Sequence, residues 1–401
     1  MTPTTNTYLK QMNKLRLSGI ALALVGASSG AHAADSVTLY GVIDTSLQYV
    51  NHANSGGDHR WGMQDGNLSG SRWGLKGSED LGGGLKAIFQ LENGFNPNTG
   101  AFHQGGKMFG RQAFVGLSGD QWGTVTLGRQ YDPLVDMVQP LTADNYFSSM
   151  FATPGDVDNN DNSSRTSNAV KYVSPVLSGF QFEGLYALGG VAGQTGSGQT
   201  WSGAATYSIG SFSAAAGYFY AANAASATKR TGWSGTSDGT FDGNFDPDTP
   251  LNNGYVTAKS IGIASVAAQY VFGPFTANLR YSNAQYRPDA ESAFFNTERY
   301  NVGGAYLGYQ ATPALLLGLG YVYTKSSGDT SATYNQVSLG ADYSLSKRTD
   351  VYLMGAWQHA SGEQGNGKGG AVQAEASVGS YGYSSAYTVQ DIVTVGIRHK
   401  F

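Results

Sequence analysis

Runs of alternating apolar and polar residues, each about ten residues long, follow one another along almost the whole chain. In the first run Val37, Leu39 and Leu47 fall on one face, whereas Thr38 and Ser46 fall on the other. A period of two residues is typical of a β-strand with one apolar and one polar face. After this run, we expect strands near 67–80, 84–97, 108–118, 122–131, 167–175, 179–189, 200–209, 211–222, 259–272, 275–287, 298–310, 314–326, 333–345, 349–361 and 388–401. The sequence therefore predicts an all-β fold of about sixteen antiparallel strands.

The connections between these runs alternate between short turns and long polar loops. Strands of a soluble β-sandwich average about 5 to 6 residues, whereas a tilted strand that crosses a bilayer needs about 9 to 11. Short turns at one end and long loops at the other are typical of a transmembrane β-barrel. The last run ends at Phe401, and an apolar strand there needs the first strand beside it to close the barrel. These features favour a barrel over a sandwich, with Phe401 at the closure.

The composition excludes several other classes of protein. Charged residues make up only 13% of the 401 residues, and the 57 Gly and 25 Tyr favour strands and turns over helices. The absence of cysteine excludes disulfides, a thiolate nucleophile and Cys-ligated metals. The net charge of −4 without a basic stripe argues against nucleic acid as a partner.

The first 33 residues have the features of a secretory signal peptide. Lys10, Lys14 and Arg16 precede a short apolar run over 17–27, and Ala31 and Ala33 complete an A-x-A cleavage signal. We therefore expect residues 1–33 to be removed and residues 34–401 to form the barrel.

Several segments resemble the general porins of Gram-negative outer membranes, particularly those of the β-proteobacterial branch. The resemblance is carried by Ser71–Ala87 (SRWGLKGSEDLGGGLKA), Arg111–Leu117 (RQAFVGL), Gly128–Gln130 (GRQ), Lys171–Pro175 (KYVSP) and Leu345–Thr349 (LSKRT). It implies a sixteen-stranded barrel in the outer membrane, assembled as a homotrimer. It also implies a third extracellular loop folded into the lumen, and contact with membrane lipid and lipopolysaccharide.

The third long connection, over residues 131–167, is the expected constriction loop. A loop of this length is usually functional or disordered. Its acidic residues include Asp132, Asp136 and Asp144, and the resemblance places Asp136 and Asp144 where the family carries constriction acids. Residues 140–143 read Pro-Leu-Thr-Ala in place of the enterobacterial Pro-Glu-Phe-Gly-Gly, so we expect a weaker acidic side.

Basic residues are expected on the opposite wall of the pore. The resemblance matches Arg72, Arg111 and Arg165 to the family's basic cluster. Strand alternation also points Lys76, Lys171 and Arg280 into the lumen, where charged side chains set ion selectivity.

These features predict a passive channel for ions and small hydrophilic solutes that is weakly anion-selective. Two alternatives remain: a substrate-selective channel, and a barrel adhesin acting through extracellular loops such as 228–259. An enzyme is not expected, because the Gly-x-Ser-x-Gly strings at 26–30 and 235–239 lie in the signal peptide and in a loop. No cofactor or metal is expected. The acidic segments 156–161 and 242–248 lack the Gly and Glu positions of an EF-hand, which leaves calcium there as a minor alternative to solvated turns.

Overall fold

The computed structural model describes residues 36–194, 196–223, 240–241 and 250–401. The expected signal peptide, both Gly-x-Ser-x-Gly strings and most of the loop 228–259 lie outside the described residues. Within the described residues, no helix is long and apolar enough to span a membrane.

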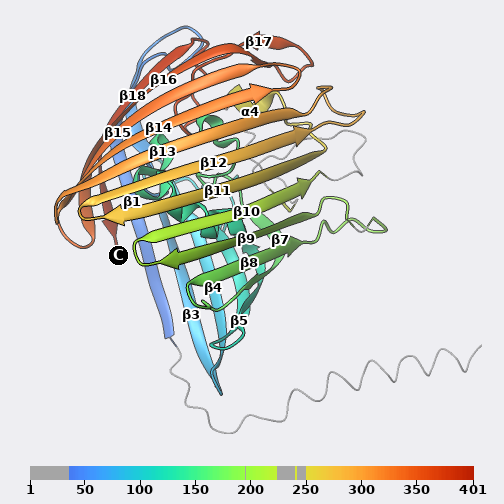
Figure 1. Cartoon of the computed structure of the whole chain (residues 1–401), viewed down its shortest axis with the longest axis vertical. Coiled ribbons are helices and arrows are strands. Elements are labelled where there is room, and N and C mark those ends of the chain that lie inside the picture. Colours follow the sequence, from blue (N-terminus) through green and yellow to red (C-terminus); the bar gives the residue numbers. More distant parts are fainter. Residues whose placement is uncertain (1–35, 195, 224–239, 242–249) are drawn as a thin grey trace, which may run out of the picture.

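The chain forms one antiparallel sheet that closes on itself (Figure 1). Its strands are β1 (Ser36–Val50), β2 (Arg60–Asp65), β3 (Arg72–Gly82), β4 (Leu85–Gly94), β5 (Gln112–Gly119), β6 (Gly123–Gln130), β7 (Thr166–Val173), β8 (Phe180–Ala187), β9 (Thr200–Ile209), β10 (Phe212–Ala222), β11 (Ser260–Phe272), β12 (Phe275–Arg287), β13 (Glu298–Thr312), β14 (Leu315–Ser327), β15 (Ala332–Ser344), β16 (Thr349–Gly365), β17 (Ala371–Gln373) and β18 (Val389–Lys400). Strands β2 and β3 pair with successive parts of β1, so together they form one strand of the wall. Strand β17 pairs only with the end of β16 and is not part of the wall. The barrel therefore has sixteen strands, as the sequence predicts.

The alternation seen in the sequence separates the two faces of the wall. In β14, outward-facing side chains are exposed and the positions between them are buried. The exposed positions are Leu317, Leu319, Tyr321 and Tyr323, and the buried ones are Gly318, Gly320, Val322 and Thr324. An apolar outer face of this kind is suited to hydrocarbon, and the closed sheet bonds the backbone of each wall strand to its neighbours.

The barrel closes between the first and the last strand. Strand β1 pairs with β18 in a register that places Val42 opposite Lys400. Phe401 extends the seam: its N–H donates to the Gly41 carbonyl at 3.0 Å, and the Gly41 N–H donates to the Phe401 carbonyl at 3.1 Å. The Phe401 ring covers Gly41, where any side chain would collide with it. The expected closure at Phe401 is therefore present in the structure.

The second wall strand is interrupted, where the sequence predicts one run over 67–80. Residues 66–71 leave the wall between β2 and β3, and Leu68 is buried. The Asp44 carboxylate of β1 holds this excursion by accepting hydrogen bonds from the N–H groups of Leu68 (2.8 Å) and Ser69 (2.9 Å). Tyr352 of β16 donates to the same carboxylate at 2.5 Å. The prediction was wrong here because these contacts join residues far apart in the sequence.

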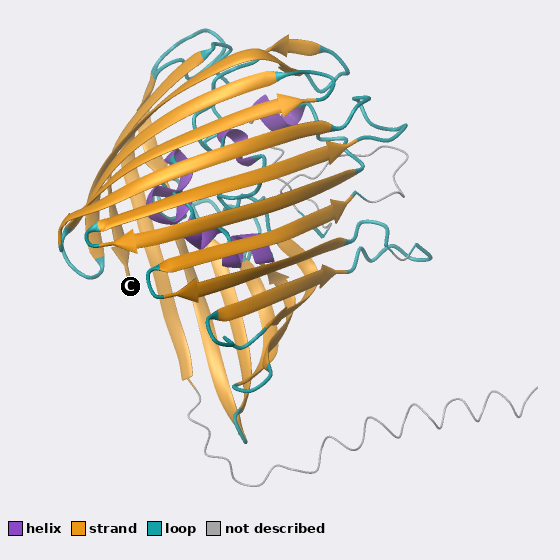
Figure 2. Cartoon of the chain, viewed as in Figure 1, coloured by secondary structure: helices purple, strands orange, loops and turns teal. Residues whose placement is uncertain are grey.

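The loop between β6 and β7, residues 131–165, consists of short helical turns. They are α2 (Pro133–Met137), η1 (Gln139–Leu141), α3 (Asp144–Phe147), η2 (Ser148–Met150) and η3 (Pro154–Asp156); a further turn, α4 (Pro250–Asn253), lies in a later loop. Figure 2 shows helices inside the barrel, and α2 contacts β8, β9 and β10. Asp156, Asn159 and Asn162 adopt left-handed backbone conformations, which Asp and Asn tolerate better than most residues. The Asp- and Asn-rich sequence of this loop thereby permits a compact path.

Candidate functional site

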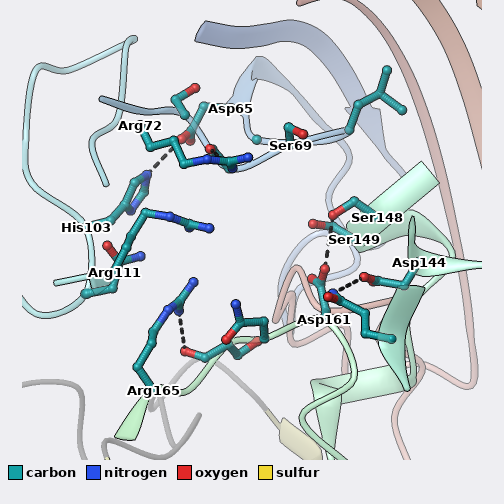
Figure 3. Close-up of a pocket in the computed structure, with 18 of the residues that line it drawn as sticks. Asp65, Ser69, Arg72, His103, Arg111, Asp144, Ser148, Ser149, Asp161 and Arg165 are labelled. Atoms are coloured by element: carbon teal, nitrogen blue, oxygen red, sulfur yellow. Dashed lines mark hydrogen bonds and ion pairs between the residues drawn. The ribbon is translucent and has the colours of Figure 1, made fainter. Parts of the chain in front are cut away.

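A cavity of about 480 Å³ lies inside the barrel between the wall and the loop 131–165. Figure 3 shows Arg72, Arg111 and Arg165 on one side of it, and Asp144 and Asp161 on the other. The remaining lining is mostly hydroxyl and amide side chains, including Gln64, Ser69, Ser71, Gln104, Gln139, Asn145, Ser148, Ser149, Asn162 and Ser163. This arrangement is a polar cavity with opposite charges on facing sides.

Two of the three arginines share one buried carboxylate. Arg111 lies just before β5, and its Nε is 2.8 Å from Oε1 of Glu92 in β4. The Nε of Arg72, at the start of β3, is 3.7 Å from Oε2 of the same carboxylate. Tyr131 accepts a hydrogen bond from Arg111 at 2.7 Å and donates one to Glu92 at 3.0 Å. Glu92 therefore fixes both guanidinium groups while cancelling only one of their two charges.

Arg165 supplies the third charge from the end of the loop. Its Nη1 donates to the Ser163 carbonyl at 3.0 Å, and its guanidinium lies 5.7 Å from the centre of the Tyr131 ring. Arg111 lies at the same distance from that ring. The Tyr131 ring thus contacts two cations, and cation–π attraction helps to hold them in place.

The acidic side of the cavity is held by hydroxyl, amide and backbone groups. Asp161 accepts hydrogen bonds from Ser148, at 3.1 Å, and from Ser380; Asp144 accepts one from Gln139. Behind them, Asp156 accepts hydrogen bonds from the N–H groups of Asp161 (2.9 Å) and Ser163. In the part of the chain that the structure describes, no Lys, Arg or His lies within 4.0 Å of these three carboxylates.

This burial changes the protonation of the loop acids. Burial, followed by the nearby carboxylates of Asp161 and Asp158, raises the pKa of Asp156 to about 8. Burial and the adjacent Asp161 also raise the pKa of Asp144 well above its usual range. At neutral pH the acidic side therefore carries less negative charge than its number of carboxyl groups suggests.

We expect alkaline pH to loosen the loop through Asp156. Because the pKa of Asp156 is higher in the folded loop than in an unfolded chain, its contribution to folding falls as pH rises from about 4 to about 8. Single-channel current noise should therefore be greater at pH 9 than at pH 6, and Asp156→Asn should reduce the difference. Equal noise at both pH values in the unaltered protein would contradict this expectation.

The other three predicted basic residues do not line this cavity. Lys76 is exposed on β3, with its Nζ 5.4 Å from the centre of the Tyr40 ring. Lys171 of β7 pairs with Asp136 at 2.5 Å and with Glu183 of β8 at 3.2 Å. Arg280 of β12 pairs with Asp158 at 2.8 Å. Lys171 and Arg280 thus connect the wall to the loop, and a pore-lining role for these three residues stays a prediction.

The three predicted acids also separate. Asp144 lines the cavity, whereas Asp136 is bound by Lys171. Asp132 caps α2 by accepting a hydrogen bond from the Leu134 N–H at 2.8 Å, and burial raises its pKa to about 6. A role for Asp132 and Asp136 in the constriction therefore stays a prediction.

Replacing Lys171 with methionine should lower stability more than it changes selectivity. The substitution leaves Asp136 and Glu183 without their cation. Breaking a buried ion pair costs roughly 3–5 kcal/mol of folding free energy. Because Asp136 is partly exposed, we expect a cost at the lower end of that range. We expect a lower thermal midpoint in detergent and an ion permeability ratio within about twofold of the original. An unchanged midpoint with a large loss of selectivity would assign Lys171 to the pore lining instead.

Other residues at the cavity were not predicted from the sequence. Glu92 and Tyr131 hold the arginines, and a hydrogen bond between His103 and Asp65 lies beside them. The last long loop also reaches the cavity region, because the Ser380 N–H donates to the Ser149 carbonyl. Inward parity of Glu92 was the available signal, but parity does not show which side chains meet across the lumen.

No group of three or more His, Asp or Glu residues in the described part of the chain has the geometry to hold a metal ion. The acidic segment 156–161 is held by hydrogen bonds within its own loop, by the ion pair of Asp158 with Arg280 and by the hydrogen bond from Ser380 to Asp161. The second candidate segment, 242–248, lies outside the described residues.

Comparisons with known proteins agree with this geometry. The sequence model of a family described as "Gram-negative porin" matches residues 21–363. The chain is 32% identical over 311 residues to an outer membrane porin protein of Bordetella pertussis, covering 71% of this chain and 64% of that protein. It is 40% identical over 185 residues to outer membrane porin protein 32 of Delftia acidovorans, covering 43% of this chain and 50% of that protein. Both matches thus span less than two thirds of the relatives' lengths.

A solved structure is similar over nearly the whole chain. The anion-selective porin from Comamonas acidovorans superimposes with a TM-score of 0.70 at 25% sequence identity. The match covers 92% of this chain and 100% of that one.

Proposed function

Because this chain belongs to the Gram-negative porin family, a family of outer-membrane β-barrels, we propose that it is a passive diffusion channel for ions and small hydrophilic solutes with weak anion selectivity. Its named relatives are porins rather than enzymes. The observation that carries the proposal is the polar cavity inside a closed barrel, with three arginines facing a buried acidic side.

Anion selectivity follows from charges close to the permeating ion. The three arginines face the cavity, and Arg72 and Arg111 share the single carboxylate of Glu92. The raised pKa values of Asp144 and Asp156 weaken the opposing charge. The net charge of −4 belongs to the whole chain and is largely screened from the lumen, since the Debye length in physiological salt is about 8 Å.

The same charges act on dipolar solutes. Guanidinium groups on one side and carboxyl groups on the other produce a transverse field, and the low-dielectric wall focuses that field across the lumen. A dipolar solute aligned with the field exposes its own charges to complementary groups, which lets it pass through a narrow polar passage. Arg72, Arg111 and Arg165 are the proposed basic side, and Asp144 and Asp161 the proposed acidic side.

We also propose assembly as a homotrimer embedded in lipid and lipopolysaccharide. The resemblance of the sequence supports this, as does the apolar outer face: Leu39, Leu127, Leu279 and Leu353 are all more than half exposed in the single chain. Large exposed apolar surface is expected to contact lipid or another subunit.

Reconstitution in a planar bilayer tests the channel directly. The purified protein should give stable conductance steps in KCl, and the steps should occur in groups of three if each subunit contains a pore. Liposomes containing the protein should swell with small sugars but not with a large polysaccharide. The absence of both conductance and swelling would overturn the channel assignment and favour a role for the extracellular loops.

A further inference from the structure

A histidine and a carboxylate are hydrogen-bonded at the edge of the cavity, beside the arginines (Figure 3). Nε2 of His103 is 2.8 Å from Oδ2 of Asp65, and the two side chains are 39% and 8% exposed. Imidazole is the side chain whose charge usually changes between about pH 5 and 8. The pair therefore places an imidazole and a carboxylate beside the three arginines.

The backbone holds both members of this pair in place. Asp65 ends β2 and pairs with Thr45 of β1. His103 lies in the loop between β4 and β5, and its backbone N–H donates to the Gly94 carbonyl at 2.9 Å. The same loop is joined to β1 by a hydrogen bond of 2.6 Å from Thr45 to Asn98. Contacts of Asp65 with β1, and of the His103 loop with β1 and β4, thus hold the imidazole at the edge of the cavity.

We propose that His103 adjusts the anion selectivity of the channel with pH, and that Asp65 positions its imidazole; this rests on the proposed channel function. When His103 is protonated it neutralises Asp65, and the three arginines dominate the passage. When His103 is neutral, the Asp65 carboxylate opposes them. Acidification therefore adds one positive charge to the basic side of the cavity.

Other charged and titratable groups face the same cavity and must be separated from His103. They are Asp65 on β2, Arg72 on β3, Arg111 before β5, and Tyr131, Asp144, Asp161 and Arg165 on the loop 131–165. The arginines stay charged throughout this pH range. The loop acids lose negative charge on acidification, so they shift selectivity in the same direction as His103 does. Only substitution of His103 itself distinguishes the two contributions.

The test measures the chloride-to-potassium permeability ratio at pH 5 and pH 8 for the full-length purified protein and two variants. One charge at about 8 Å in water changes the energies of chloride and potassium by about 0.5 kcal/mol in opposite directions. Screening by about 0.15 M salt reduces the resulting difference to about 0.4 kcal/mol, which changes the ratio about twofold. His103→Gln should lower the ratio about twofold at pH 5 and leave it unchanged at pH 8. His103→Arg should do the opposite, raising the ratio about twofold at pH 8 and leaving it unchanged at pH 5.

This pattern separates a charge effect from a structural one. The contact between His103 and Asp65 could instead only hold the loop between β4 and β5 in place. Both variants would then shift the permeability ratio in the same direction at both pH values, and this result would overturn the proposal. If His103→Gln kept the full pH dependence, the titrating groups would be the loop acids and the proposal would be wrong. If the unaltered protein were cation-selective or closed at every pH, the proposed function itself would be wrong. The two failures are distinguishable, because each variant is compared with the unaltered protein.

Discussion

Replacing Arg72, Arg111 and Arg165 together with serine is expected to turn the channel from anion-selective to cation-selective. These arginines face the cavity, and the substitution leaves Glu92, Asp65, Asp144 and Asp161. A unit charge at about 6 Å in water contributes about 0.7 kcal/mol. This energy has opposite signs for chloride and potassium, which doubles its effect on their permeability ratio, whereas screening by about 0.15 M salt roughly halves it. Three such charges therefore change the chloride-to-potassium permeability ratio about 30-fold.

The triple substitution also leaves Glu92 buried without a cation, which threatens folding. A second variant that adds Glu92→Gln removes this problem, and it should still lower the ratio, because two net positive charges are lost. Lys76→Ser is the matched control, since Lys76 does not line the cavity. If Lys76→Ser changed selectivity as much as the triple variant, the assignment of the basic side would be wrong.

Placing a side chain at Gly340 is expected to displace the loop 131–165 from the wall. The ring of Phe147 lies against Gly340 of β15 and Gly318 of β14, and the ring of Phe151 lies against Gly320. A Cβ added at Gly320 would be 2.5 Å from the Phe151 ring, and one added at Gly340 would be closer still to Phe147. Overpacking of this kind costs about 1–3 kcal/mol. Gly340→Val should lower the thermal midpoint and increase current noise.

A double-mutant cycle isolates this contact. Phe147 is fully buried, and Phe147→Ala should itself cost about 3–5 kcal/mol. In the Phe147→Ala background, however, Gly340→Ala should cost little, because the colliding ring is gone. Gly303→Ala is the matched control: Gly303 lies in β13, and an added Cβ there has no atom within 4 Å. Additive effects of Phe147→Ala and Gly340→Ala would contradict this docking of the loop.

The wall could be predicted from the sequence because its pattern is local. A two-residue period shows both a strand and its outward face, so the expected runs 200–209 and 275–287 coincide with β9 and β12. The excursion at 66–71 could not be predicted, because the groups that hold it come from Asp44 and Tyr352.

The candidate site was predicted only in part, for a similar physical reason. Parity and resemblance indicated Arg72 and Arg111, which do face the cavity. Strand alternation also predicts that Lys171 and Arg280 face the lumen. In the structure, however, the loop 131–165 covers them, with Asp136 bound to Lys171 and Asp158 bound to Arg280. What lies opposite an inward side chain depends on the path of the loop. That path is set by contacts such as Phe147 on Gly340, which no local pattern reveals.

The zero-current potential of the unaltered channel under a KCl gradient at pH 7 tests the central claim most directly. We expect the sign of an anion-selective pore, because three arginines face the cavity while burial raises the pKa values of Asp144 and Asp156. A potential of the cation-selective sign would mean that the loop carboxylates outweigh Arg72, Arg111 and Arg165, and it would contradict the account.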